Sequence, residues 1–295
     1  MNATSALPLP PAMSVPAKRL RGTSLAGPLP GLPLAMGMTL VWLGLIVLLP
    51  LSALLLKAAT LGGAGWIKVM TDPRVLAALR LSFGTALGAA AFDTVVGALI
   101  AWVLVRYRFK GRAFFDALVD LPFALPTAVA GIALTALYAG NGWIGQLLAP
   151  YHVKVAYTPT GIAVALAFVG LPFCVRTLQP VMQNLGAELE EAAASLGATR
   201  FTTLRRVMLP PLLPAMITGF ALAFARGVGE YGSVIFIAGN IPKVSEIAPL
   251  LIVIKLEQYD YAGAAAVATL MLGLSFVILL LLNILQRKLA HGRHD

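Results

Sequence analysis

Long apolar stretches without charged residues recur along the whole chain. A helix needs about 20 apolar residues to cross the roughly 30 Å hydrocarbon layer of a bilayer. Asp, Glu, Lys and Arg are absent from five stretches of this kind, and a sixth contains only Asp93. The pattern predicts an all-α integral membrane protein with about six transmembrane helices, near residues 34–56, 81–105, 118–140, 159–179, 212–238 and 263–286.

Composition supports the membrane class. Hydrophobic residues make up 59% of the chain and charged residues 12%, whereas soluble domains carry about 25% charged residues. The first apolar run is too long and too far from the N-terminus for a signal peptide, so we expect it to be retained. The expected organisation is a disordered, Pro-rich cytoplasmic leader (1–33), a first transmembrane helix with an external loop (34–80), a transmembrane domain (81–286) and a cytoplasmic tail (287–295).

The net charge of +10 comes from basic residues that are distributed unevenly between the two sides of the predicted bundle. With both termini on one side, that side has fourteen Lys and Arg residues and the other has seven, while Arg226 falls inside the fifth span. The positive-inside rule therefore places the termini and the 105–117 and 180–211 connections in the cytoplasm. Basic residues placed in this way indicate topology and lipid-headgroup contacts rather than nucleic-acid binding.

The fourth connection, residues 183–211, is patterned like two short amphipathic helices. Apolar residues recur at helical spacing on both sides of Gly197, which interrupts the pattern; they are Leu189, Ala193 and Leu196 before it and Phe201, Leu204, Val207 and Met208 after it. We expect Pro210 and Pro211 to end the second helix. Such a unit cannot bury its own apolar stripe and is suited to a groove on a partner. The alternative is a hairpin lying on the headgroups, which the glutamates of the first helix disfavour.

At this point the chain resembles the permeases of ABC importers. Glu191-Ala192-Ala193, Gly197 and Leu209-Pro210 match the EAA loop of that family, with Val207 where isoleucine is commoner. The resemblance implies a type I permease bundle in which this loop docks into a cleft of a separate ATP-hydrolysing subunit.

Further stretches resemble one branch, the T-type permease subunit of bacterial sulfate/thiosulfate importers. They are RYRFKGR (106–112), DLPFALPTAVAG (120–131), GEYGSVIFIAGNI (229–241) and residues 259–268. The resemblance implies import of sulfate or thiosulfate across the bacterial inner membrane by a complex. That complex would contain a second homologous permease subunit, two ATPase subunits that hold ATP-Mg, and an external sulfate-binding protein. Molybdate permeases share the EAA loop and a similar GE-[FY]-G segment and stay open as an alternative.

Two other classes of function fit the sequence less well. The chain has no G-x-x-x-x-G-K-[ST] phosphate loop, and its histidines all lie outside the predicted spans. We therefore expect no catalytic residues, metal or cofactor in this chain. An ion-coupled secondary carrier would show inverted repeats, which the sequence lacks, and would leave the 183–211 loop without a role.

Charged residues inside the predicted spans are the remaining candidates for function. Arg226 and Glu230 are four residues apart in the fifth span and can meet on one helix face, and Gly229 and Gly232 beside them permit a bend. Either charge alone would cost about 2.5–3.5 kcal/mol at mid-membrane. The pair is either a gate or pathway element or a structural ion pair. Asp93 is expected at an interface or paired with a partner subunit.

Overall fold

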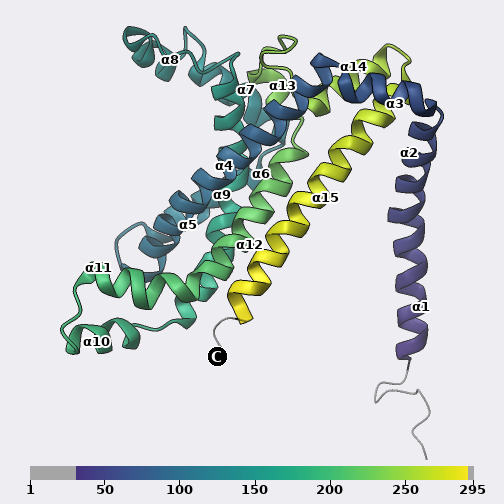
Figure 1. Cartoon of the computed structure of the whole chain (residues 1–295). Helices are drawn as coiled ribbons and strands as arrows, with labels where there is room; N and C mark the ends of the chain where they lie inside the picture. The colour runs from purple at the N-terminus through teal and green to yellow at the C-terminus, as the bar shows by residue number, and fades with distance from the viewer. Residues whose placement is uncertain (1–30, 292–295) are drawn as a thin grey trace, which may run out of the picture. The chain divides into compact units, whose positions relative to one another are not determined.

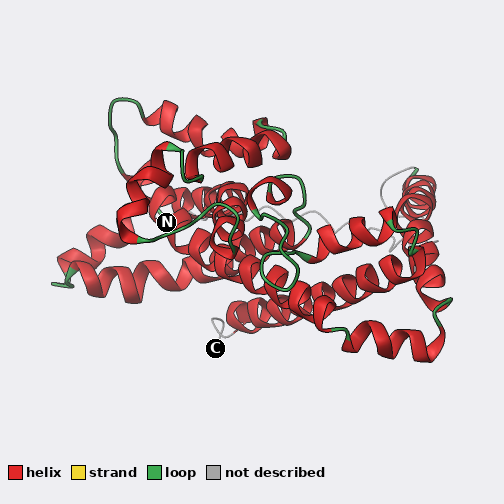
Figure 2. Ribbon diagram, turned by 90° about the horizontal axis from the view of Figure 1, so that it is seen from above, coloured by secondary structure: helices red, strands yellow, loops and turns green. Residues whose placement is uncertain are grey.

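The computed structural model of the chain describes residues 31–291, with side chains to 288. This part is built from helices joined by loops and turns and contains no strand (Figure 2). The all-α prediction is confirmed. The predicted leader lies outside the described residues except for its last three, and so do residues 292–295 of the predicted tail.

The chain divides into two compact units, Met1–Ser52 and Ala53–Asp295. The described part of the first unit contains α1 (Leu32–Leu43), the π-helical turn η1 (Gly44–Leu48) and the beginning of α2 (Leu49–Ala59). No side chain of α1 or η1 is buried. An apolar helix with every face exposed is stable only against lipid or another protein.

The second unit continues α2 and contains the remaining helices. They are α3 (Gly62–Thr71), α4 (Pro73–Arg106), α5 (Arg112–Val119), α6 (Leu121–Ala124), α7 (Thr127–Tyr138), α8 (Trp143–Leu148), η2 (Ala149–Tyr151), α9 (Pro159–Asn184), α10 (Glu188–Ser195), α11 (Arg200–Thr202), η3 (Thr203–Met208), α12 (Leu209–Val228), α13 (Val234–Ile237), α14 (Ala248–Glu257) and α15 (Tyr261–His291). Helices α4, α9 and α12 form its centre. Small residues on their facing sides, such as Ala86, Ala90 and Ala223, let the backbones approach closely.

Six helical stretches in the described residues are long and apolar enough to cross a membrane, so the predicted number of spans is confirmed. They are Leu32–Ala59, Pro73–Arg106, Thr127–Tyr151, Pro159–Asn184, Arg200–Val228 and Tyr261–Lys288. The second begins eight residues before the predicted start because Asp72 caps the helix, accepting a hydrogen bond from the Arg74 N–H (2.8 Å), and Pro73 suits the first turn.

The third predicted span, a single helix over 118–140, is wrong. The chain instead forms α5, α6 and α7 in succession, with Leu125 extended at φ −89° and ψ 134°. A residue that precedes proline is disfavoured in the helical region, and Pro126 therefore separates α6 from α7. By contrast, Pro172 and Pro180 lie inside an unbroken α9.

The fifth span is also displaced from its predicted position of 212–238. Pro210 and Pro211 do not end the preceding helix, which runs without a break from Arg200 to Val228. The π-helical η3 ends at Met208, two residues before Pro210, as η1 ends at Leu48, two residues before Pro50. A π-helical turn thus precedes the proline in each of these two helices, whereas α9 continues through Pro172 and Pro180 without one.

The second unit has two distinct ends (Figure 1). Helices α10 and α11 and the C-terminal end of α15 lie at one end, and α3, α8, α13 and α14 lie at the other. At the second end, α15 begins after Asp260, which accepts hydrogen bonds from the Gly263 N–H and the Lys255 ammonium (both 2.9 Å). This arrangement places the 183–211 connection and the 105–117 connection at the same end of the bundle.

Candidate functional site

The prediction of two helices separated at Gly197 is confirmed, but only the first is short, because the second continues to Val228. Helix α10 ends at Ser195, and Gly197 adopts the left-handed conformation with φ +80°. The Gly197 N–H bonds to the Ala194 carbonyl (2.9 Å), and the Ala198 N–H bonds to that of Ala193 (3.0 Å). This is a Schellman motif, whose left-handed position strongly favours glycine. The spacing from Glu191 to Gly197 is therefore the distance from the fourth residue of α10 to the left-handed residue that follows its C-terminal end.

The connection leaves large apolar side chains exposed. Leu196 is 88% exposed and Phe201 71%, while Ala193 is buried against the chain itself. Thr199 begins the next helix by accepting a hydrogen bond from the Thr202 N–H. Two rigid helices thus present an apolar face that nothing in the described residues covers.

Arg106, in the last turn of α4, holds α10 in place. Its guanidinium lies 2.9 Å from the Glu190 carboxylate and donates a hydrogen bond to the Gly186 carbonyl (3.0 Å). It also lies over the Trp102 ring, 5.7 Å from the centroid, where a cation–π contact is worth about 0.5–1 kcal/mol or more. The short α10 helix is therefore fastened to a spanning helix by its polar face.

Arg226 and Glu230 do form an ion pair, although not within one helix as predicted. Helix α12 ends at Val228, and Glu230 lies in the following turn. Its second carboxylate oxygen accepts hydrogen bonds from the Ser233 N–H (2.9 Å) and hydroxyl (3.0 Å). The Glu230 side chain is 2% exposed and that of Arg226 34% exposed. The glutamate is thus fixed inside the protein, while part of the guanidinium faces outward.

The two predicted glycines beside this pair differ in importance. A Cβ on Gly232 would lie 2.2 Å from the Thr127 hydroxyl at the start of α7, so a side chain cannot fit without movement. A Cβ on Gly229 would meet nothing closer than 3.9 Å. The cavity beside Glu230, between α4, α9 and α12, has a volume of about 10 Å³, room for one water molecule at most.

Asp93 lies inside the bundle of this chain, which corrects the prediction of an interface position. It is 1% exposed, and neither carboxylate oxygen has a hydrogen-bond partner among the described residues. A Cβ on Gly170 of α9 would lie 2.3 Å from it. The absence of a side chain at Gly170 is what makes room for the carboxyl group.

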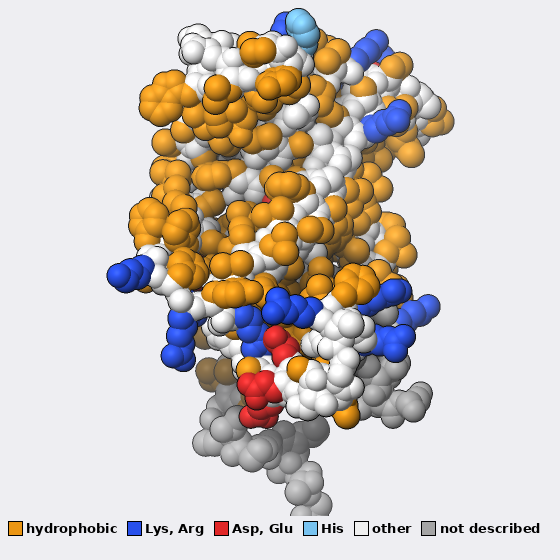
Figure 3. All heavy atoms as spheres, turned by 90° about the vertical axis from the view of Figure 1, so that its left-hand side faces the viewer, with side chains coloured by type: hydrophobic (Ala, Val, Ile, Leu, Met, Phe, Trp, Pro, Cys, Tyr) orange, Lys and Arg blue, Asp and Glu red, His pale blue; other side chains and the backbone are white. Residues whose placement is uncertain are grey.

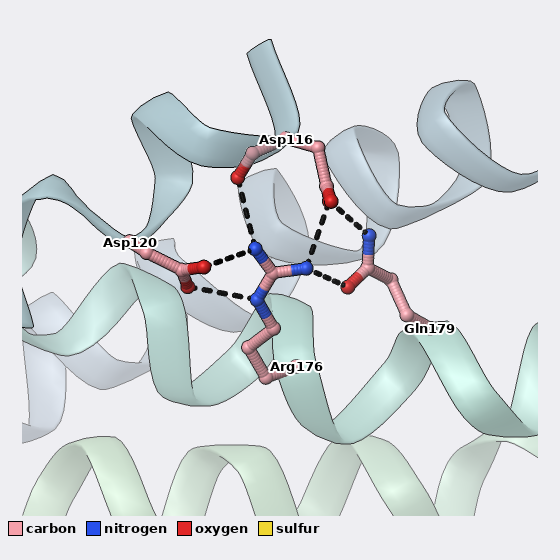
Figure 4. A network of polar contacts seen from close by, with 4 residues as sticks. All are labelled: Asp116, Asp120, Arg176 and Gln179. Atoms are coloured by element: carbon pink, nitrogen blue, oxygen red, sulfur yellow. Dashed lines mark hydrogen bonds and ion pairs between the residues drawn. The ribbon is translucent and has the colours of Figure 1, made fainter. Parts of the chain in front are cut away.

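A second polar network, which sequence reasoning missed, joins α9 to α5 and α6 (Figure 4). Arg176 donates to both carboxylate oxygens of Asp120 (2.8 and 2.5 Å) and to Asp116 (2.8 Å). Gln179 accepts from Arg176 (2.6 Å) and donates to Asp116 (2.9 Å). Two features of the sequence could have indicated this network: Arg176 lies at the edge of a long apolar stretch, and Asp116 and Asp120 are four residues apart. In the distribution of basic residues Arg176 is one of the fourteen on the side of the termini, and that distribution does not indicate its partners.

A third pair was also missed at the opposite end of the unit. Arg74 of α4 donates to both carboxylate oxygens of Glu246 (2.8 and 2.6 Å), and the Glu246 side chain is 1% exposed. The next residues are held by the Ser82 hydroxyl, which accepts from the Ala248 N–H (2.8 Å). Nothing in the local sequence marks two residues this far apart as partners. In the described residues, no three His, Cys, Asp or Glu side chains are grouped to hold a metal ion.

Comparison with known proteins gives concordant matches. The family described as "Binding-protein-dependent transport system inner membrane component" matches residues 93–291. The chain is 50% identical over 260 residues to the sulfate transport system permease protein CysT of Salmonella typhimurium, covering 88% of this chain and 94% of that protein. It is 49% identical to the proteins of the same name from Escherichia coli, with the same coverage, and from Synechocystis sp., covering 84% and 87%.

Solved structures agree in fold. A bacterial ABC transporter that imports the acidic polysaccharide alginate contains a chain that matches with a TM-score of 0.72 at 16% identity, covering 87% of this chain and 95% of that one. A chain of that transporter in complex with an alginate-bound periplasmic protein also matches with a TM-score of 0.72 at 16% identity, covering 87% of this chain and 94% of that one. The bundle described above is therefore that of a type I ABC-importer permease.

Proposed function

This chain belongs to the family of inner-membrane components of binding-protein-dependent transport systems, and we propose that it is the permease subunit through which an ATP-driven importer moves sulfate or thiosulfate across the bacterial inner membrane. The observation that carries the proposal is the identity of about 50% to sulfate permeases over 88% of the chain. Identity of this extent includes the spanning helices as well as the coupling loop.

The partners follow from what this chain lacks. It has no phosphate loop, so ATP-Mg would be held and hydrolysed by separate ATPase subunits, two of them for a pair of permeases. We propose that a second, related permease completes the membrane bundle and that a sulfate-binding protein delivers the anion from outside. Both termini, the 105–117 connection and the 183–211 connection would lie in the cytoplasm, in accord with the distribution of basic residues.

Coupling would occur through the exposed face of α10 and α11. In this proposal Glu191, Ala192, Ala193 and Gly197 shape the docked helix, and Leu209 and Pro210 continue it into the membrane. The exposure of Leu196 and Phe201 supports this role, because an apolar helix face is suited to a groove on a partner. Movement of the ATPase subunits would then be passed on as rigid-body motion, provided that the loop contacts their two states differently.

The anion pathway would pass the exposed side of Arg226. A partly exposed guanidinium at membrane depth is too costly to face lipid and normally faces an aqueous cavity or a partner. Glu230 would hold the guanidinium in position, and the close contact of Gly232 with Thr127 would fix the turn that carries Glu230. The cavity beside Glu230 is far too small for a tetrahedral oxyanion, so passage would require these helices to separate.

Reconstitution tests the function directly. The chain would be assembled in proteoliposomes with its ATPase subunits, its second permease and the binding protein, and ATP hydrolysis and anion uptake would be measured for sulfate, thiosulfate and molybdate. Stimulation by sulfate or thiosulfate but not by molybdate supports the proposal. Stimulation by molybdate alone would contradict the substrate, and uptake by the purified chain without ATPase subunits would contradict the class of transporter.

A further inference from the structure

An apolar groove lies where α4 ends and α5 begins. It has a volume of about 370 Å³ and is lined by Leu99, Ile100, Val103, Leu104, Phe109 and Phe115. The Phe109 and Phe115 rings are 6.0 Å apart between centroids and form one side. Every lining side chain is hydrophobic, so water fills the groove poorly and an apolar occupant is favoured.

The groove continues an exposed stripe along α4. Phe92, Val95, Leu99 and Val103 are 44–63% exposed and recur three or four residues apart, which places them on one helix face. The stripe is free of charge and consists of bulky side chains, whereas faces that pack other membrane helices are rich in small residues. This face of α4 therefore has the chemistry of a surface in contact with lipid.

Two cationic residues flank Phe109, one of the residues that line the groove, in the sequence. Arg108 and Lys110, on either side of Phe109, are exposed, and neither makes a hydrogen bond or ion pair with a described residue. Arg106 differs because Glu190 and Gly186 engage it. Figure 3 shows the same division on one face of the molecule, with a broad hydrophobic surface bordered at its lower edge by Lys and Arg side chains.

We propose that this groove binds one acyl chain of an anionic phospholipid, with its phosphate held by Arg108 and Lys110. The groove begins about 10 Å from the end of α4, since Leu99 precedes Arg106 by seven residues at about 1.5 Å each. This depth matches the acyl region of one leaflet. A basic loop beside it complements a negative headgroup, each basic residue strengthening binding by about fivefold.

Native mass spectrometry of the assembled importer tests the site, with phosphatidylglycerol and phosphatidylcholine of the same acyl chains as probes. The wild-type complex should retain more phosphatidylglycerol than phosphatidylcholine. The Arg108→Gln/Lys110→Gln variant should lose roughly 30-fold of this preference, because both headgroup contacts are removed. Leu99→Trp, which fills the groove, should lower retention of both lipids.

The control variant is Lys154→Gln/Lys243→Gln, which removes two exposed basic charges at the opposite end of the bundle and should keep the preference. Unchanged lipid preference in Arg108→Gln/Lys110→Gln would overturn the proposal. So would release of an ATPase subunit from that variant with its lipids retained, since the basic loop would then serve a protein partner. Preserved assembly and melting temperature in both double variants would show that the loss of lipid is not a loss of folding.

Discussion

The guanidinium of Arg106 pairs with the carboxylate of Glu190 at 2.9 Å and so joins the end of a membrane-spanning helix to α10, the first helix of the 183–211 connection. Both side chains are partly buried, at 15% and 33% exposure. An ion pair in such a setting is stronger than one on an open surface, where the contribution is about 0–1 kcal/mol. The pair therefore helps to keep α10 in one orientation relative to α4.

The Arg106–Glu190 pair should be needed for coupling rather than for insertion. We expect Arg106→Gln to lower anion uptake several-fold while the chain still inserts, because it loses the ion pair, the Gly186 hydrogen bond and the Trp102 contact. Glu190→Gln should have a smaller effect, since it removes the ion pair alone. Glu188→Gln, on the same helix and exposed, is the matched control. Uptake and ATPase co-purification are the measurements, and wild-type uptake by Arg106→Gln would contradict the role.

Gly197 should tolerate asparagine better than alanine or valine. Its φ of +80° is strained for any residue with a Cβ, but asparagine is the next most common occupant of this cap position. No atom lies within 4 Å of a Cβ built there, so the cost comes from the backbone, at about 1–2 kcal/mol. We expect ATPase co-purification and uptake to fall in the order Gly, Asn, Ala, Val. Equal uptake by all four proteins would show that the turn at Gly197 is not needed for coupling.

The Arg226–Glu230 pair can be separated into structural and pathway roles by neutralisation. Arg226→Gln alone leaves the buried Glu230 charge without its partner, which costs about 3–5 kcal/mol, and should lower the amount of folded protein. Arg226→Gln/Glu230→Gln should recover folding, and we expect it to remain inactive because the pathway cation is missing. Quantities of folded complex and sulfate uptake are measured together. Recovery of both in the double variant would leave the pair with a structural role only.

Arg74 and Glu246 should behave as a purely structural pair. Arg74→Gln strands a buried carboxylate and should destabilise the protein by about 3–5 kcal/mol, while Arg74→Gln/Glu246→Gln should regain most of that loss. Arg80→Gln, at an exposed basic residue of the same helix, is the control and should change stability little. Thermal unfolding of the purified complex measures the stabilities of these three variants. Similar melting temperatures for Arg74→Gln and Arg80→Gln would contradict it.

Asp260 should give stability that depends on pH. The Lys255 ammonium and, after it, the Gly263 N–H hold the pKa of Asp260 below its usual value. Because the pKa is lowered on folding, the contribution is complete above about pH 5 and is lost as the pH falls below about 4. We expect Asp260→Asn to lower the melting temperature at pH 7 by no more than about 3 °C, as suits an exposed pair, and to have a progressively smaller effect as the pH falls below about 4. A loss of melting temperature in Asp260→Asn that becomes larger as the pH falls would contradict this prediction.

The sequence predicted the elements that depend on local patterns. The number of spans follows from hydropathy, and the α10–Gly197 elbow follows from helical spacing and from the backbone conformation that glycine allows. The errors arose where local rules compete. Pro126 separates two helices, whereas Pro210 lies in a continuous helix, as Pro172 and Pro180 do in α9. A pattern of residue types does not reveal that difference.

The missed contacts are those between distant parts of the chain. Arg176 meets Asp116 and Asp120 across about 60 residues, and Arg74 meets Glu246 across 172. Charge and spacing along the sequence identify such residues as unusual but do not pair them. The Arg226–Glu230 pair was found because its members are close in sequence, although the helix that was expected to bring them together ends at Val228.

The unbroken helix from Arg200 to Val228 has a mechanical consequence. Its 29 residues follow a path about 43 Å long at 1.5 Å per residue, with the turn at Gly197 just before one end and Arg226 near the other; the path bends between α11 and the end of α12 (Figure 1). A hinge at Pro210 would have absorbed any push within the first ten residues. Because the helix continues through Pro210 without an intervening loop, we expect a displacement imposed at Phe201 to be passed along the helix toward Arg226.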